Sequence, residues 1–296
     1  MLRIMTLNVG SLFEPDWQTR RHEVVAQIQA AEADIICLQE VWQEAPGEGT
    51  AEWIAEALAG AGTTYHLTFG GHGFGTFAEK NPAFRFGSAV LSRWPIDETH
   101  TWRLPIVEGT PDPVPAMMPW ELVHARTAGL DIFTTHLAPA PTHGRHRRLQ
   151  VLKIDELIRQ LRPHQDGFDD GLQRTAMPAI LTGDFNAEPD SDEIRFLKGL
   201  TVFGDRTTFF QDAWAVAGDD GPGYTSDWRT HELSAVLNIH RKRIDYVFVG
   251  DPFYRVGSAG RVHSCRVIAN EPLTGVQASD HRGLLVEVEW PTRPAG

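Results

Sequence analysis

Cysteine is almost absent from this chain. Cys37 and Cys265 are the two cysteines among 296 residues, and they lie far apart in apolar or mixed strand-like segments. Neither a disulfide framework nor a cysteine-based zinc site can be built from them. We expect both to be buried free thiols in a reducing compartment, with Cys37 inert between Ile36 and Leu38.

The chain also lacks an excess of basic residues. It has 27 Lys and Arg against 39 Asp and Glu, which gives a net charge of −12. Nonspecific binding to nucleic acid depends on Lys and Arg that displace counterions, so this balance argues against a general affinity for polyanions. A local basic site is still compatible with this net charge.

Long hydrophobic runs are missing too. No stretch approaches the roughly 20 apolar residues of a membrane helix, so no stable membrane insertion is expected. The N-terminal segment MLRIMTLNVG has neither a long apolar core nor a small-residue cleavage site. If the chain begins natively at Met1, we expect it in the cytoplasm. The sequence carries no signal of an oligomeric state.

Hydrophobic periodicity predicts strands that alternate with helices. Strands are predicted over residues 1–12, 34–41, 88–92, 121–126, 130–136, 178–182, 243–249 and 283–290. Helices are predicted over residues 16–31, 50–59 and 145–161. The Gly- and Phe-rich segment 69–80 is predicted to be a loop, and the Pro-rich segment 105–119 is incompatible with a central strand or helix interior. Without repeats or linkers, residues 1–296 are expected to form one domain, a large sandwich of mixed strands and helices.

Polar side chains lie at or near the ends of six predicted strands. They are Asn8, Glu40, His136, Asp184, Asn186, Asp245, Asp280 and His281. Each of them alone has a structural explanation as a turn residue, a cap or a solvated strand end. Together they predict a functional edge of a layered fold, where loops on a rigid scaffold carry function. Such an oxygen-rich set suits Mg²⁺ or Mn²⁺.

The order of short motifs resembles one known family. The blocks TLNVG, ICLQEV, GSAVLSRWPI, TTHL, LTGDFNAEP, RIDYVFV and SDHRGLLVEV follow one another from about Met5 to about Trp290. This series is similar to the endonuclease/exonuclease/phosphatase family, which includes DNase I-like nucleases, neutral sphingomyelinases, inositol polyphosphate 5-phosphatases and deadenylases. The resemblance implies a four-layer α/β sandwich with two central, mainly antiparallel sheets flanked by helices. It also implies metal-dependent hydrolysis of a phosphoester.

The resemblance implies a role for each residue of the predicted edge. Glu40 matches the main Mg²⁺ ligand, with Asn8 beside it and Asp280 near the metal. Asp184 matches the acid that orients or deprotonates the attacking water, and Asn186 a group that holds the phosphate. His281 matches a histidine that contacts the phosphate, Asp245 the carboxylate that fixes its ring, and His136 the second histidine. His136 makes the abasic-site endonuclease branch less consistent with the sequence.

These roles agree with the chemistry of the residues themselves. A phosphodiester is anionic, so a divalent cation is needed to offset charge on its non-bridging oxygens. Imidazoles near the phosphate can donate hydrogen bonds to oxygens that gain charge in the transition state. A carboxylate such as Asp184 can hold a water in line, and no covalent intermediate is required.

The sequence gives less information on which residues select the substrate. Candidate contact segments are residues 70–86, 110–120 and 223–243. Tyr224 and Trp228 could stack a base among nearby basic residues, although a solvated loop would have the same composition. Arg148 lies in the basic run that begins the 145–161 helix and could face an anionic partner or pair with surface acids.

Three hypotheses follow. The leading one is a phosphodiesterase or phosphatase with Mg²⁺ or Mn²⁺ and a small or accessible phosphoester substrate, whether a small molecule, a lipid headgroup or a nucleic acid. The second is a DNA or RNA nuclease of the same fold. The third is a binding module that has lost catalysis, which the presence of Glu40, Asp184 and His281 disfavours.

Overall fold

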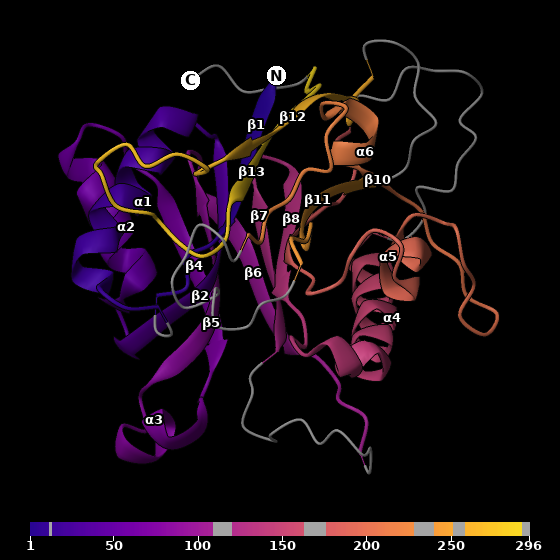
Figure 1. Ribbon diagram of the computed structural model, residues 1–296, viewed down its shortest axis with the longest axis horizontal. Helices are drawn as coiled ribbons and strands as arrows, with labels where there is room; N and C mark the ends of the chain where they lie inside the picture. Colours follow the sequence, from indigo (N-terminus) through magenta and orange to yellow (C-terminus); the bar gives the residue numbers. More distant parts are fainter. Residues whose placement is uncertain (12–13, 109–119, 163–175, 228–239, 251–257, 292–296) are drawn as a thin grey trace.

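Two β-sheets pack face to face between two layers of helices (Figure 1). The structure is a computed structural model, and it describes residues 1–11, 14–108, 120–162, 176–227, 240–250 and 258–291. Within these residues no helix combines the length and hydropathy that crossing a bilayer requires.

The first sheet has the strand order β12-β13-β1-β2-β5-β4, with β3 paired to β2. Its strands are β1 (Leu2–Asn8), β2 (Ile35–Ala45), β3 (Glu48–Gly49), β4 (His66–His72), β5 (Arg85–Ser92), β12 (Val262–Ile268) and β13 (Gly283–Val288). Among these pairs β1 and β2 run parallel and the others antiparallel.

The second sheet has the order β10-β11-β9-β8-β7-β6. Its strands are β6 (Ile96–Arg103), β7 (Glu121–Thr127), β8 (Leu130–His136), β9 (Ile180–Asp184), β10 (Phe210–Asp212) and β11 (Asp245–Gly250). Here β8 and β9 are the parallel pair. The predicted architecture of two mainly antiparallel sheets is confirmed.

The three helices predicted over residues 16–31, 50–59 and 145–161 are present as α1, α2 and α4. The described helices are α1 (Trp17–Ala31), α2 (Thr50–Gly60), α3 (Gly75–Lys80), α4 (Gly144–Leu161), α5 (Asp192–Leu197) and α6 (Ala213–Ala217), with a 3-10 turn η1 (Pro141–His143) before α4. Helices α1 and α2 cover the outer face of the first sheet, and α4 and α5 cover the second (Figure 1).

Strand alternation builds three apolar layers. Met5 and Leu7 of β1 face α1 and α2, whereas Leu2 and Ile4 face the other sheet. In the second sheet Phe133 packs toward α4, on the opposite face from Ile132. Because side chains alternate with a period of two, each strand contributes to one outer layer and to the layer between the sheets.

The prediction of a loop over residues 69–80 is wrong. This segment contains the end of β4 and helix α3. Its glycines indicate a loop in the sequence, but in the structure they permit close packing. A Cβ on Gly70 would lie 2.4 Å from the Thr101 hydroxyl. One on Gly87 of β5, which pairs with Gly71, would lie 2.1 Å from the Gly70 carbonyl oxygen. The glycines therefore mark a tight contact between strands.

Five strands were not predicted: β3, β4, β6, β10 and β12. Strand β6 is a polar, largely exposed edge strand, so hydrophobic periodicity gives it no signal. Strand β12 also lies at the edge of its sheet, and it contains Cys265, for which the sequence indicates a strand-like segment. In the Pro-rich segment, residues 109–119 lie outside the described residues.

Both cysteines are buried, as expected. Burial raises the pKa of the Cys37 thiol to about 12, and it does the same for Cys265. Thiols with such pKa values stay neutral near pH 7, where the thiolate is the reactive form.

Gly183 cannot accept a side chain. Its φ is +134°, and a Cβ would lie 1.9 Å from the carbonyl oxygen of Thr135 on the parallel strand. Gly183→Ala is expected to lower the free energy of unfolding by about 3 kcal/mol or more, through backbone strain and overpacking. Gly60→Ala is the control, because nothing lies within 4 Å of its added Cβ. Equal urea midpoints for the two variants would contradict this prediction.

Candidate active site

The predicted site residues extend the inner face of the central strands. In β1 the inward side chains run from Ile4 through Thr6 to Asn8. The same parity gives Ile132, Thr134 and His136 in β8, and Ile180, Thr182 and Asp184 in β9. The layer between the sheets thus changes from apolar to polar toward one edge, because side chains of one parity share a face.

Strand register brings these ends together. In the parallel pairs Asn8 lies opposite Gln39 and His136 opposite Asp184, while antiparallel β11 sets Asp245 opposite Asp184. A buried bond from Gln39 Nε2 to Thr134 Oγ1, 2.9 Å long, links the two sheets just behind this edge. The polar ends therefore meet on a rigid scaffold.

Glu40 reaches the site through a β-bulge. The register of β2 against β5 shifts between Leu38 and Val41, and Glu40 has a φ of 57°. A bulge inserts an extra residue and re-aims its side chain. Asn8 Nδ2 donates to Glu40 Oε1 at 3.0 Å, so the bulged side chain is held at the edge beside β1.

Asn8 joins two carboxylates. Its Nδ2 also donates to Asp184 Oδ2 at 3.1 Å, while its Oδ1 accepts the Gly10 N–H. The amide nitrogen thus faces Glu40 and Asp184, and the oxygen is engaged by the backbone. The expectation that Asn8 is a metal ligand stays a prediction, and the arrangement gives this side chain an orienting contact to both acids.

Two imidazoles flank Asp184. His136 Nε2 lies 3.5 Å from Asp184 Oδ2, and His281 Nε2 lies 3.7 Å from the same oxygen. Asp184 Oδ1 accepts the Asn186 N–H at 2.8 Å. Asp184 is buried, so its orientation is fixed from several sides. Carboxylate and imidazoles converge on one small volume.

His281 forms a buried pair with Asp245. Its Nδ1 lies 2.9 Å from Asp245 Oδ2, so Nε2 points toward Asp184. Burial lowers the pKa of His281, but the carboxylates of Asp245, Asp280 and Asp184 outweigh it and raise that pKa well above its usual value. This surrounding negative charge favours the imidazolium form of the ring.

Negative charge accumulates on the Glu40 side of the site. Burial, together with the nearby Asp280, raises the pKa of Glu40 against the opposing effect of His136. Burial and the Asp280 carboxylate also raise the pKa of Glu14, a neighbour that was not predicted, to about 7. Such crowding of oxygen donors favours a cation, which would offset their repulsion, and hard divalent ions prefer these ligands.

A second grouping could also hold a metal. The ligand atoms of Asp184, Asp245 and His281 all lie within 4.8 Å of one another. A metal ligand must be deprotonated, however, and His281 carries a raised pKa and is already bonded to Asp245. The metal position at Glu40, Asn8 and Asp280 that the sequence implies stays a prediction.

Asn186 has a left-handed backbone, with φ 48°. Its Nδ2 donates to the Leu137 carbonyl oxygen at 3.0 Å, so the side chain ties β9 to the segment that follows His136. Contact with a phosphate stays a prediction for this residue.

Arg20 was missed by the sequence analysis, because an arginine on a helix usually faces solvent. Here it is 5% exposed, and its guanidinium bonds to backbone carbonyls on both loops that carry the acids. The acceptors are the carbonyl oxygens of Val9, Gly10, Glu14, Pro15 and Ala278. Arg20 therefore joins the loop after Asn8 to the loop before Asp280.

Arg20→Lys is expected to lower the free energy of unfolding by about 3 kcal/mol, because a lysine has three donors and no planar fork, so carbonyls lose their partners. Urea unfolding followed by circular dichroism measures the change. Arg126→Lys is the control, since that side chain is 47% exposed and should change stability by less than about 0.5 kcal/mol. Similar midpoints for both variants would contradict the role of Arg20.

The predicted substrate residues lie apart. Arg148 is exposed, and its guanidinium lies 4.5 Å from the centroid of the Phe203 ring. The neighbouring Arg147 turns inward and bonds to Glu193 and to the Ala138 carbonyl. Tyr224 lies under Arg241, one residue before Thr225, whose hydroxyl accepts the Asp245 N–H. Trp228 lies outside the described residues.

Comparisons with known proteins agree with this fold. The family model described as "Endonuclease/Exonuclease/phosphatase family" matches residues 5–281. A search of curated proteins returned no match.

Several solved structures share the fold. A family protein from Leptotrichia buccalis has 20% identity and a TM-score of 0.63, with 98% of this chain and 100% of that chain covered. One from Beutenbergia cavernae has 22% identity and a TM-score of 0.66, with 97% and 71% covered. D. rerio TDP2 complexed with single strand DNA product has 18% identity and a TM-score of 0.64, with 96% and 97% covered.

Proposed function

The chain belongs to the endonuclease/exonuclease/phosphatase family, and on that premise we propose that it is a divalent-metal-dependent phosphoesterase using an in-line water. Members of this family are hydrolases. The observation that carries the proposal is Asp184, flanked by His136 and His281 at 3.5 and 3.7 Å and joined through Asn8 to Glu40. An acid, two imidazoles and a metal-side carboxylate are groups that can position water and offset charge in phosphoester hydrolysis.

Glu40 and Asp280 would hold Mg²⁺ or Mn²⁺, which when bound offsets charge on the non-bridging oxygens of the phosphate. Asn8 keeps Glu40 oriented through its 3.0 Å bond. Arg20 joins the loop after Asn8 to the loop before Asp280.

Asp184 would orient the attacking water. Its Oδ2 accepts from Asn8 and its Oδ1 from Asn186, so the carboxylate is fixed before the substrate binds. A positioned carboxylate at hydrogen-bond distance from water can align it with phosphorus and accept its proton.

His281 and His136 would donate hydrogen bonds to phosphate oxygens. The Asp245 bond to Nδ1 fixes the His281 ring, so its Nε2–H faces the position of the substrate. Because the imidazolium is charged, it interacts more strongly with oxygens that gain negative charge in the transition state. No covalent intermediate is required.

The favoured substrate is a small or accessible phosphoester. The net charge of −12 argues against a broad surface for polyanions. A nuclease is the second candidate, and the fold likeness to a TDP2 complexed with single strand DNA product favours including it.

Hydrolysis of bis-p-nitrophenyl phosphate against p-nitrophenyl phosphate, each with Mg²⁺ or Mn²⁺, tests the reaction class. We expect faster release from the diester. Preference for the monoester would indicate a phosphatase, and cleavage of single-stranded DNA or plasmid at higher kcat/KM would favour the nuclease. No release from any of these substrates would contradict the proposal.

A further inference from the structure

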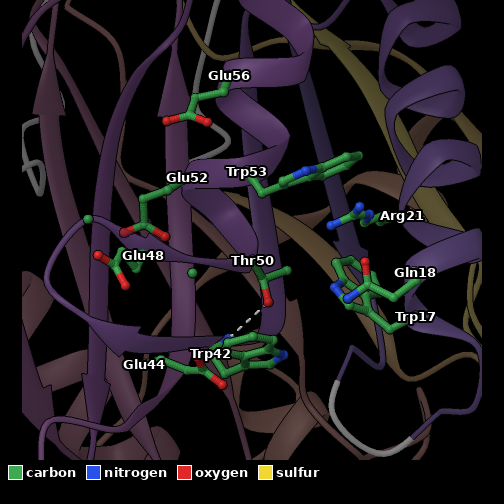
Figure 2. Close-up of a pocket in the computed structure, with 12 residues that line it drawn as sticks. Trp17, Gln18, Arg21, Trp42, Glu44, Glu48, Thr50, Glu52, Trp53 and Glu56 are labelled. Carbon is green, nitrogen blue, oxygen red and sulfur yellow. Dashed lines mark hydrogen bonds between the residues drawn. The ribbon is translucent and has the colours of Figure 1, made fainter.

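A cavity lies outside the candidate active site. It has a volume of about 320 Å³ and is bounded by α1, α2 and the hairpin of β2 and β3 (Figure 2). Its lining includes three tryptophans and four glutamates: Trp17, Trp42, Trp53, Glu44, Glu48, Glu52 and Glu56. This volume is at the lower end of the range for small-molecule sites, so it suits a small ligand.

The aromatic rings come from three different elements. Trp17 begins α1, Trp42 lies on β2 and Trp53 on α2, and each of them is half-buried. Two of these rings already contact a cation, since the Arg21 guanidinium lies 4.1 Å from the centroid of Trp53 and the Arg20 guanidinium lies 5.5 Å from that of Trp17. Tryptophan has the most favourable ring face for cation–π contacts.

The lining carries uncompensated negative charge. The carboxylates lie to one side of the cavity, while Arg21, Trp17 and Trp53 lie on the other (Figure 2). Within the part of the chain that the structure describes, no ion pair involves any of the four glutamates or Arg21. Glu52 Oε2 is also buried and accepts no hydrogen bond from the described residues.

This charge excludes the phosphoester as the ligand. Four carboxylates against one guanidinium repel an anion and attract a cation. A weakly hydrated cation with apolar methyl groups matches indole faces better than a strongly hydrated one does, because less hydration is lost on binding.

We propose that this cavity binds a small organic cation bearing a methylated ammonium group. The ammonium would lie against the indoles of Trp42 and Trp17, with the carboxylates supplying the opposite charge. The cavity adjoins the metal side of the candidate active site, since Thr50 Oγ1 lies 3.4 Å from Ser11 Oγ, which donates to the Glu40 carbonyl oxygen. The proposal is independent of the reaction that the active site performs.

Isothermal titration calorimetry with choline and tetramethylammonium tests it. The control ligand is 3,3-dimethylbutan-1-ol, which has the shape of choline without its charge. We expect both cations to bind at least about tenfold more tightly than the alcohol. Equal affinity for the alcohol, or no heat from either cation, would overturn the proposal. Tighter binding of arginine amide would also overturn it, in favour of a basic side chain of a partner.

Variants separate charge from shape. The double variant Glu48→Gln/Glu56→Gln removes two exposed pocket charges and should weaken cation binding severalfold. Asp205→Asn/Asp220→Asn makes the same change of net charge elsewhere and should leave binding unchanged. If both double variants weakened cation binding equally, the effect would come from the overall charge of the protein. That result would overturn the proposed site.

The binding measurement does not depend on catalysis. Glu40→Gln, which should inactivate the enzyme, is expected to bind choline as the unaltered protein does. Trp42→Leu should abolish choline binding, with thermal unfolding as the check that it folds. Retained binding by a folded Trp42→Leu protein would contradict the aromatic contribution.

Discussion

Replacing Glu40 by Gln is expected to reduce metal-dependent hydrolysis by about 10³-fold, because the charged ligand of the cation is lost. The fold should be unaffected. Burial and Asp280 already raise the pKa of Glu40, so a neutral amide relieves repulsion in the metal-free protein. Initial rates on the diester, metal titration by calorimetry and thermal unfolding measure the three effects.

The matched control is Glu79→Gln, an exposed glutamate of α3. It changes the net charge equally and should keep full activity and metal affinity. A Glu40→Gln protein with unaltered turnover would show that the catalytic metal is not held by this side chain.

The second large effect is expected for Asp245→Asn, with a fall in kcat of about 10²–10⁴-fold. Asp245 is bonded to His281 Nδ1 at 2.9 Å, and its charge is the largest contribution that raises the pKa of that ring. Without this charge the pKa of His281 falls. The active imidazolium is then lost at lower pH, so the alkaline limb of the rate profile should move toward acid pH.

The control is another buried histidine–aspartate pair. His124 Nε2 lies 2.9 Å from Asp131 Oδ1 at the opposite end of β8 from His136. Asp131→Asn should lower the stability of the fold without shifting the alkaline limb of the pH–rate profile. If the alkaline limb of the pH–rate profile kept its position in Asp245→Asn, the assignment of His281 as the charged group would be contradicted.

Part of the candidate site was predictable from sequence because Asn8, His136 and Asp184 each end a largely buried strand. Asp245 instead begins β11, and His281 precedes β13. In β8 the run from Leu130 to Thr134 alternates in burial side and ends at His136. The same pattern precedes Asp184 in β9. Periodicity fixes which face a strand end occupies, and short connections limit which ends can meet.

Contacts between distant segments could not be predicted in this way. Arg20 resembles a solvated helix residue, and only the folded chain brings the carbonyls of Val9 and Ala278 to it. The bulge at Glu40 gives no local sequence signal, because a positive φ is unusual for glutamate.

The tryptophan cavity illustrates the same limit. Trp17, Trp42 and Trp53 are separated in sequence and each has an ordinary helical or strand context. Their convergence depends on how α1 and α2 pack over the first sheet. Composition alone gives the number of tryptophans and acids without their arrangement.

The most direct test of the metal-dependent site is hydrolysis of bis-p-nitrophenyl phosphate by protein treated with EDTA and then dialysed. The account predicts no turnover in the treated protein, recovery with Mg²⁺ or Mn²⁺, and little recovery in Glu40→Gln at the same metal concentration. Full turnover after removal of divalent ions would contradict it.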